Sequence, residues 1–288
     1  MFLRKLKKFV LKAMAMKSLV TGCAGFIGSH LSEALLRAGH KVTGVDCFTD
    51  YYPRSIKEKN ISRATLDKNF TFVEKDIIEL NSNILNAVDY VFHLAAQPGV
   101  RKSWESFDTY VRNNINATNH LLQVCKDKSV KRFVFSSSSS VYGNTVPMSE
   151  DSEPRPISPY GITKLACENL CNVYHSSHNI PTVVLRYFSV YGPRQRPDMA
   201  FGRFIENILK AEKITIFGDG MQTRDFTFVD DVVTATVLSS EKDCIVKTIN
   251  VGSNYSITLK DAISIIEETV GKKAKTEYIK KQKGDAEN

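Results

Sequence analysis

The sequence predicts an α/β fold: a Rossmann-type, doubly wound parallel sheet with a smaller C-terminal lobe interleaved with it. Two patterns carry this prediction: short, continuously apolar segments alternate with amphipathic ones, and a glycine-rich turn follows the first apolar segment. Continuous apolar strands are typical of a parallel sheet that helices cover on both faces. The length of 288 residues, 42% of them hydrophobic, allows one large domain with a small lobe.

The strands expected in the main sheet are short and rich in β-branched or aromatic residues. Segments with apolar residues at helical spacing separate them, and we expect helices at 105–128 and 158–178. A turn within 23–40 leads into a further helix. The expected strands are 17–22, 41–46, 70–76, 88–96, 130–136 and 181–188.

The alternation loosens after residue 188. A loop containing Pro and Arg, YGPRQRPDMA, comes first. It is followed by a helix near 201–211, short strands around 213–217 and 247–251, and a helix at about 258–270. We therefore expect a main unit over 16–188 and a smaller lobe over 189–288.

Most of the basic excess lies at the N-terminus. The formal net charge is +8, but five Lys and Arg lie in the first fifteen residues, and the rest of the chain carries +3. This nearly balanced remainder needs no nucleic-acid partner. Residues 1–15 also place apolar side chains at helical spacing, which predicts a basic amphipathic extension able to touch an acidic membrane surface weakly. The alternative is a simple upstream extension, since Met16 opens the first strand well.

The six cysteines are scattered, with no CxxC pair and no His/Cys cluster at zinc spacing. We interpret them as reduced thiols of a cytoplasmic protein and expect no metal. No stretch of the sequence reaches the roughly eighteen consecutive apolar residues of a membrane span.

The turn TGCAGFIG places Gly22, Gly25 and Gly28 between the first strand and the first helix. Glycines there permit a tight turn and let the backbone approach a pyrophosphate, which the N–H groups of the helix N-terminus attract. Asp46 closes the second strand, where a carboxylate can accept both ribose hydroxyls and repel a 2′-phosphate. The pattern predicts NAD rather than NADP; the alternative for Asp46 is an ordinary strand-end carboxylate.

The segment SPYGITK places Tyr160 and Lys164 four residues apart, on one face of a helix. A phenol is a weak base at neutral pH, and a neighbouring ammonium stabilises its deprotonated form. Such a pair alone is often just a solvated helix face. Together with the glycine turn, it predicts a proton-transfer site beside a dinucleotide.

These motifs resemble those of the extended short-chain dehydrogenase/reductase superfamily, and within it the NAD-dependent nucleotide-sugar epimerases. The resemblance extends from about residue 17 to residue 285. It rests on the segments TGCAGFIGSHL, HLAAQPGVR, SSSSSVYG, SPYGITK, LRYFSVYGPRQRPDMA and GDGMQTRDFTFVDD.

The resemblance implies a catalytic group of Ser138, Tyr160 and Lys164. Tyr160 would remove the O4 proton of a UDP-sugar while its C4 hydride passes to bound NAD, and the hydride would return to the other face of the 4-keto sugar. Ser138, four residues before the tyrosine of VYG, would steer the O4 hydrogen. Lys164 would also hold the ribose. The further cofactor contacts that it implies are Phe26, Ile27, Asp76, Ile77, Ala95 and Asn114.

The substrate contacts implied by the resemblance begin with Arg224 in TRDF, on the nucleotide diphosphate. Sugar-nucleotide dehydratases of the superfamily carry an Asp-Glu pair where this chain has Ser139 and Ser140, so dehydration is disfavoured. The segment YFSVYGPRQRPDMA most resembles the branch that includes UDP-glucuronate 4-epimerases. There, an arginine at the position of Arg196, near Ser189, meets the uronate carboxylate.

Fixing that carboxylate suits the chemistry, because a 4-keto uronate is a β-keto acid that readily loses CO₂. The alternative is that Arg194 and Arg196 bind the diphosphate or order their loop, with UDP-glucose or UDP-N-acetylglucosamine as the substrate. The other interpretations are a reductase or decarboxylase of the same fold, and a catalytically impaired dinucleotide-binding sensor.

The resemblance also implies a homodimer that pairs helices 105–128 and 160–178 across a twofold axis. Members of the family continue past Gly284 and Asp285 into a terminal helix, so we expect this chain to be shortened at its C-terminus.

Overall fold

The structure, a computed structural model, describes residues 16–280. Its main sheet has, within these residues, seven strands in the order β10-β6-β5-β4-β1-β2-β3, all parallel to their neighbours. The prediction of a doubly wound parallel sheet is confirmed. The strands are β1 (Lys17–Thr21), β2 (Lys41–Asp46), β3 (Phe70–Glu74), β4 (Tyr90–His93), β5 (Arg132–Ser138), β6 (Thr182–Tyr187) and β10 (Thr248–Val251).

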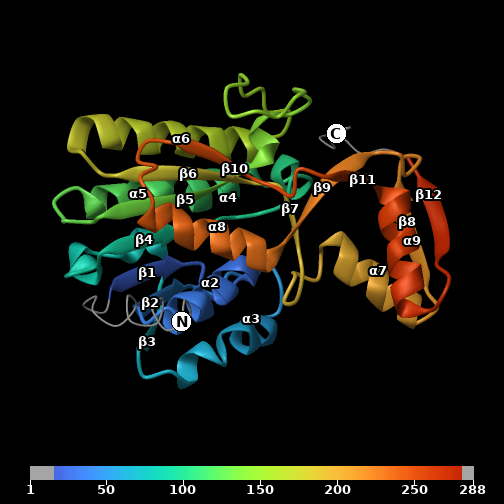
Figure 1. The fold of residues 1–288 in the computed structure, drawn as a ribbon, viewed down its shortest axis with the longest axis horizontal. Helices are drawn as coiled ribbons and strands as arrows, with labels where there is room; N and C mark the ends of the chain where they lie inside the picture. The colour runs from blue at the N-terminus through green and yellow to red at the C-terminus, as the bar shows by residue number, and fades with distance from the viewer. Residues whose placement is uncertain (1–15, 281–288) are drawn as a thin grey trace, which may run out of the picture.

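Helices cover both faces of this sheet (Figure 1). Because successive strand residues point to opposite faces, Val20 and Val134 pack on one side and Leu19 and Phe133 on the other. The first side is covered by α2 (Phe26–Arg37) and α8 (Val229–Glu241), with α3 (Arg54–Ile61) beyond the edge of α2. The second is covered by α5 (Ala117–Cys125) and α6 (Pro159–His178).

The long helix expected over 105–128 is divided in the structure. A short α4 (Phe107–Tyr110) passes into a π-helical turn, Val111–Asn116, and then into α5. Asn114 explains part of this irregularity, because its buried side chain bonds the backbone N–H of Gln97 and the hydroxyl of Thr163. Tertiary contacts have therefore overridden the regular helical pattern of the sequence.

The smaller lobe lies at one end of the main sheet, on the right in Figure 1. The parallel strands β8 (Lys213–Phe217) and β12 (Lys275–Ile279) pair there, and α7 (Ala200–Leu209) packs with α9 (Leu259–Val270) in a separate apolar cluster. A small sheet of β11 (Ser256–Thr258), β9 (Thr223–Phe228) and β7 (Ser189–Tyr191) connects the lobe to the main sheet.

Several elements go beyond those that the sequence indicated. Strand β10 follows the first strand of the lobe in the chain, yet it returns to the main sheet and pairs with β6. The helices α3 and α8 and the strands β7, β9, β11 and β12 were not foreseen. Over residues 16–280, no helix has the length and apolar character needed to cross a bilayer. The expectations for residues 1–15 and for Gly284 and Asp285 lie outside the described residues.

Candidate functional site

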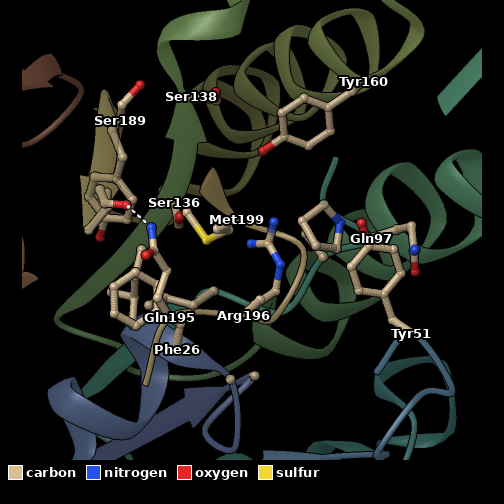
Figure 2. A pocket seen from close by; sticks show the side chains of 18 of the residues that line it. Phe26, Tyr51, Gln97, Ser136, Ser138, Tyr160, Ser189, Gln195, Arg196 and Met199 are labelled. Carbon is tan, nitrogen blue, oxygen red and sulfur yellow. Dashed lines mark hydrogen bonds between the residues drawn. The ribbon is translucent and has the colours of Figure 1, made fainter. Parts of the chain in front are cut away.

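A cavity of about 1080 Å³ opens at the carboxyl edge of the main sheet, between the sheet and the smaller lobe. This is the edge at which doubly wound sheets bind ligands. The glycine turn, the serines after β5, the first turn of α6 and the loop after β7 all contribute to its wall. Figure 2 shows the hydroxyl of Tyr160 and the guanidinium of Arg196 pointing into it.

The glycine turn shapes the floor of this cavity by close backbone contacts. Gly22 has a φ of +71°, and a Cβ there would lie 2.8 Å from the backbone N of Ala95. A Cβ on Gly28 would lie 2.1 Å from the carbonyl oxygen of Gly22. Neither position tolerates a side chain. With glycine at both, no side chain from these positions covers the turn, and the start of α2 stays accessible to a ligand. Its N–H groups form a site suited to a pyrophosphate.

Asp46 closes β2 beside this turn. Its Oδ2 accepts the N–H of Ala24 (3.1 Å) and its Oδ1 accepts that of Phe48 (2.9 Å). Burial raises the pKa of Asp46, although these hydrogen bonds and the nearby charge of Lys57 oppose the shift. Each carboxylate oxygen has a second lone pair, so the group can still accept from two ribose hydroxyls. Turn, helix N-terminus and carboxylate together fit a dinucleotide.

The Tyr–Lys pair lies on the first turns of α6. Helix formation starts at Ser158, whose side chain accepts the N–H of Gly161 at 3.1 Å. Lys164 is buried and donates from Nζ to the carbonyl oxygen of Ser136 at 2.7 Å. Tyr160 is half-buried, and its ring meets that of Tyr110 edge-on with centroids 6.2 Å apart. The two predicted side chains therefore reach one cavity.

The serine row ends β5 and continues into a short 3₁₀ turn, Ser139–Val141. Ser138 caps this turn, because its Oγ accepts the N–H of Ser140 at 3.1 Å. Ser137 donates its hydroxyl to Glu168 on α6 at 2.5 Å. The row thus combines cavity wall (Ser136, Ser137, Ser138) with a turn that leads away from the sheet.

A buried ion pair lies behind the serines. Arg186 of β6 donates from Nε and Nη2 to the two oxygens of Glu168, at 3.0 and 2.7 Å. Both side chains are only 5% exposed. Nη1 of the same arginine donates to the hydroxyl of Tyr142 (2.8 Å), which in turn donates to Asn250 of β10. The pair therefore ties together α6, β5, β6 and β10 immediately below the candidate catalytic serine.

The predicted substrate residues Ser189, Arg196 and Arg224 also line the cavity. Arg196 donates from Nε and Nη2 to the carboxylate of Asp198, at 3.0 and 3.2 Å. Arg224 lies on β9 and donates to the carbonyl oxygen of Thr223 at 2.6 Å. The structure therefore brings the candidate diphosphate and carboxylate contacts to the same cavity as Tyr160.

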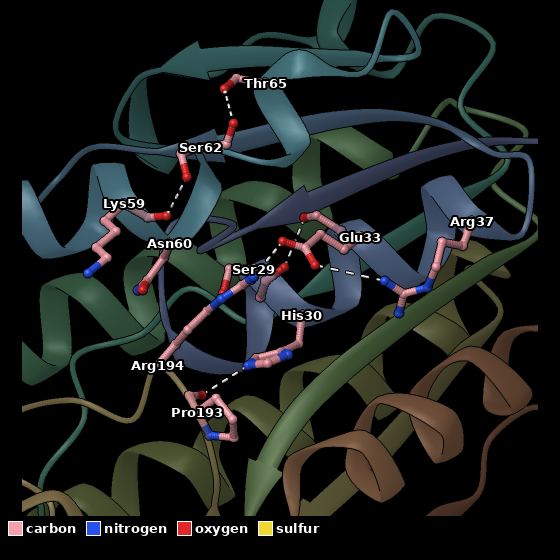
Figure 3. A network of polar contacts seen from close by, with 12 residues as sticks. Ser29, His30, Glu33, Arg37, Lys59, Asn60, Ser62, Thr65, Pro193 and Arg194 are labelled. Atoms are coloured by element: carbon pink, nitrogen blue, oxygen red, sulfur yellow. Dashed lines mark hydrogen bonds and ion pairs between the residues drawn. The ribbon is translucent and has the colours of Figure 1, made fainter.

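Arg194, by contrast, points out of the cavity. It has a left-handed φ of +64°, and it donates to Glu33 of α2 at 2.6 Å. In the same network, the Nε2 of His30 lies 2.9 Å from the carbonyl oxygen of Pro193, which can only accept (Figure 3). For Arg194, the structure therefore favours the alternative of a residue that orders its loop.

Asn114 is not among the residues that line the cavity. It is buried behind the wall and bonds both the N–H and the carbonyl of Gln97. The remaining predicted cofactor residues do line the cavity, including Phe26, Ile27, Asp76, Ile77 and Ala95. Asp76 is additionally paired with Arg112 at 2.8 Å.

Other lining side chains were not named from the sequence. Gln97 and Arg101 follow β4 at the carboxyl edge, and their place in HLAAQPGVR is a signal that could have found them. Tyr51 lies in the loop between β2 and α3, where no periodic pattern marks it. The further unnamed side chains include Tyr52, Lys57, Gln195, Met199, Phe217 and Gln222.

A nucleotide-binding turn and a Tyr–Lys pair, at one edge of a doubly wound parallel sheet, define an NAD-binding enzyme of the short-chain dehydrogenase type. Comparison with known families agrees. The chain belongs to the NAD dependent epimerase/dehydratase family, whose model matches residues 18–252.

Similar proteins cover nearly the whole chain. A Bacillus subtilis protein described as an uncharacterized UDP-glucose epimerase, YtcB, is 46% identical over 278 residues, which are 95% of this chain and 88% of that protein. A UDP-glucuronate 4-epimerase of Thermodesulfobacterium geofontis is 42% identical over 93% of this chain and 84% of its own length. The solved UDP-glucuronic acid 4-epimerase from Bacillus cereus, in complex with UDP-glucuronic acid and NAD, superposes with a TM-score of 0.91 and 47% identity, over 94% of this chain and 88% of that one.

Proposed function

We propose that this protein is an NAD-dependent UDP-sugar 4-epimerase, an isomerase whose preferred substrate is UDP-glucuronate. The observation that carries the proposal is the convergence of Ser138, Tyr160 and Lys164 on the cavity that the glycine turn also lines. The similarity to UDP-glucuronate 4-epimerases in sequence and fold supports it.

The dinucleotide fits the floor of the cavity. The turn at Gly22–Gly28 and the N-terminus of α2 would hold the pyrophosphate, and Asp46 the adenosine ribose. When bound, NAD supplies reversible hydride transfer at C4 of the sugar. The part of the chain up to residue 188 would hold this cofactor, and the part from 189 would mainly hold the sugar nucleotide.

Tyr160 would take the proton of the sugar O4, because its hydroxyl points into the cavity that Ser138 also lines. Lys164 has three N–H donors, of which one is given to Ser136. The other two can stabilise the tyrosine oxygen and hold a ribose hydroxyl. Ser138 would orient the O4 hydrogen. At Ser139 and Ser140, no acid–base pair is present that would favour dehydration.

The sugar nucleotide would lie across the cavity towards the smaller lobe. Arg224 would bind the diphosphate, since a guanidinium matches phosphate oxygens. Ser189 and Arg196 would bind the C6 carboxylate, which distinguishes UDP-glucuronate from UDP-glucose.

The cellular setting and the assembly follow from other features. The cysteines at positions 16–280 are all free, which supports a reducing cytoplasm. A homodimer through α6 is supported by two large apolar side chains on its outer face, Ile162 (50% exposed) and Val173 (57%). Replacing Val173 by glutamate should shift the protein towards monomers in size-exclusion chromatography with light scattering.

Product analysis tests the proposed activity. Purified protein is incubated separately with UDP-glucuronate, UDP-glucose and UDP-N-acetylglucosamine, and the C4 isomers are separated. We expect UDP-galacturonate to form fastest, and Tyr160→Phe to lower kcat about 10³-fold because it removes the proton acceptor. NAD binding should persist in that variant. Absence of C4 isomers with all three sugars would refute the proposal, and release of CO₂ with a pentose product would indicate a decarboxylase.

A further inference from the structure

One edge of the Arg196 guanidinium, in the cavity, is hydrogen-bonded to a neighbouring carboxylate. Its Nε and Nη2 donate to the two carboxylate oxygens of Asp198, two residues later in the chain. This is a side-on pair, and neither hydrogen bond uses Nη1. Figure 2 shows the guanidinium projecting into the cavity, on the side where the Tyr160 hydroxyl lies. The pair therefore fixes which edge of the guanidinium remains for a ligand.

Tyr51 holds Asp198 in turn. Its hydroxyl donates to Oδ2 at 3.0 Å across a separation of 147 residues in the chain, from the loop between β2 and α3. Burial and the neighbouring Asp198 raise the pKa of Tyr51 to about 12, so the hydroxyl stays protonated at neutral pH. Burial acts to raise the pKa of Asp198, but Arg196 and the hydrogen bonds from Arg196 and Tyr51 lower it. All three groups keep the protonation states that the contacts require.

Neighbouring residues fix the position of the Tyr51 side chain in the cavity wall. A Cβ on Gly99, which has a φ of +100°, would lie 2.7 Å from the Tyr51 hydroxyl. The Nζ of Lys102 lies 4.5 Å from the centre of the Tyr51 ring. Gly99 leaves room for the Tyr51 hydroxyl because it has no side chain, and the Lys102 ammonium packs over the Tyr51 ring. These two contacts fix the tyrosine, so Tyr51 can in turn orient Asp198.

An arginine needs such support to discriminate between ligands. Its side chain loses about 2 kcal/mol of rotamer freedom when it is fixed. Its directional N–H groups suit a carboxylate, whereas a hydroxymethyl group offers one acceptor oxygen and no charge to match. Two opposing effects of Asp198 must be weighed: it pre-orients Arg196, and its own charge repels a second carboxylate. Asp198 is already paired with Arg196, so pre-orientation should dominate.

Resting on the proposed function above, we propose that Asp198 and Tyr51 are positioning residues for sugar specificity. They hold Arg196 so that its Nη1 edge faces the C6 substituent of the sugar, and thereby make the site select a hexuronate over a neutral hexose. Neither residue takes part in the proton or hydride transfer.

The test compares two substrates in two variants. KM and kcat are measured for UDP-glucuronate and UDP-glucose with the NAD-loaded wild type, Asp198→Asn and Tyr51→Phe, and affinities for both sugars are measured by calorimetry. Asparagine keeps the size but cannot accept from both guanidinium nitrogens. We expect Asp198→Asn to raise KM for UDP-glucuronate about tenfold and Tyr51→Phe about threefold, with changes of less than about twofold for UDP-glucose.

The matched controls are Asp89→Asn and Tyr90→Phe, at the opposite end of the sheet. Asp89, like Asp198, is paired with a basic side chain, in this case Lys131 at 2.8 Å. Both controls should leave the ratio of the two KM values unchanged. If Asp198→Asn fails to fold, Tyr51→Phe keeps the carboxylate and tests the same point.

The outcomes separate this inference from the proposed function. A lower KM for UDP-glucuronate in Asp198→Asn would show that charge repulsion dominates and would overturn the inference. Equal changes for both sugars, or no change, would also overturn it while leaving the epimerase activity established. If the wild type converts none of UDP-glucuronate, UDP-glucose and UDP-N-acetylglucosamine, the proposed function fails as well; if it converts one of the neutral sugars but not UDP-glucuronate, the glucuronate assignment and the inference fail together.

Discussion

Two arginine–carboxylate pairs have the same two nitrogens bonded to two oxygens, but only the arginine of one pair, Arg196, lines the cavity. Arg186 and Glu168 are each 5% exposed, behind the serine row. Arg196 and Asp198 are 20% and 39% exposed, at the ligand side. The first pair also bonds Ser137 and Tyr142, whereas the second is held by one tyrosine hydroxyl. The same type of ion pair is therefore buried in one place and partly exposed to solvent in the other.

The difference separates what stabilises the fold from what a ligand can rearrange. Removing one member of a buried pair leaves an uncompensated charge, which is costly. Removing one member of a partly exposed pair allows water to take its place, at little cost. We therefore expect the pair behind the serines to determine stability, and the pair at the ligand side to determine specificity.

The largest expected effect comes from breaking the buried pair. Glu168→Ala should lower the free energy of unfolding by about 3–5 kcal/mol, because Arg186 is left charged and buried. Urea denaturation at saturating NAD measures the change. The matched control is Glu153→Ala, which removes a largely exposed partner of Arg155 and should cost less than about 1 kcal/mol. Equal losses in the two variants would contradict the assignment.

A smaller effect is expected from the ligand-side pair. Asp198→Asn should lower the free energy of unfolding by no more than about 1 kcal/mol, since the pair is partly exposed and screened by solvent. The measurement is the same urea titration, without substrate. A loss as large as that of Glu168→Ala would show that this pair, too, stabilises the fold and would remove the contrast between the two pairs.

The smallest effect concerns pH. The pKa of Asp198 in the folded protein lies below its ordinary value of 3.8, because Arg196 and Tyr51 outweigh the effect of burial. A lowered pKa stabilises the folded state above the unfolded value, and this contribution is lost as the pH falls through the folded value. The stability difference between wild type and Asp198→Asn should be constant above about pH 5 and should shrink as the pH falls below the unfolded value and through the lower folded value. A difference that grows on acidification would contradict the charge state assigned to Asp198.

Most of the main sheet could be predicted from the sequence, because each strand is a short apolar run bounded by a turn. The small lobe was harder. Strand β12 is exposed along its whole length, and α8 carries β-branched residues in a pattern shared by strands and helices. The return of β10 to the main sheet depends on contacts between distant segments, which local patterns do not contain.

The residues of the site also differ in how far local sequence predicts them. Gly22, Asp46, Tyr160 and Lys164 follow from local chemistry at fixed spacing, and the structure brings them to one cavity. Tyr51 could not be foreseen, since its role depends on a partner 147 residues away. Asn114 was expected at the cofactor from the family resemblance alone; its side chain bonds Gln97 and Thr163 in a buried network, and a cofactor contact there stays a prediction.

The π-helical turn before α5 has a consequence for insertions and deletions. It holds one residue more than an α-helical turn of the same span, so the extra residue is accommodated without rotating the helix on either side. Deleting one residue from 111–116 would allow a regular α-helical turn and leave Tyr110 and α5 in their present relation, but it would redirect the side chains inside the turn. Asn114 would then lose its contacts with Gln97 and Thr163. This segment should accept changes of residue type far more readily than a change of length.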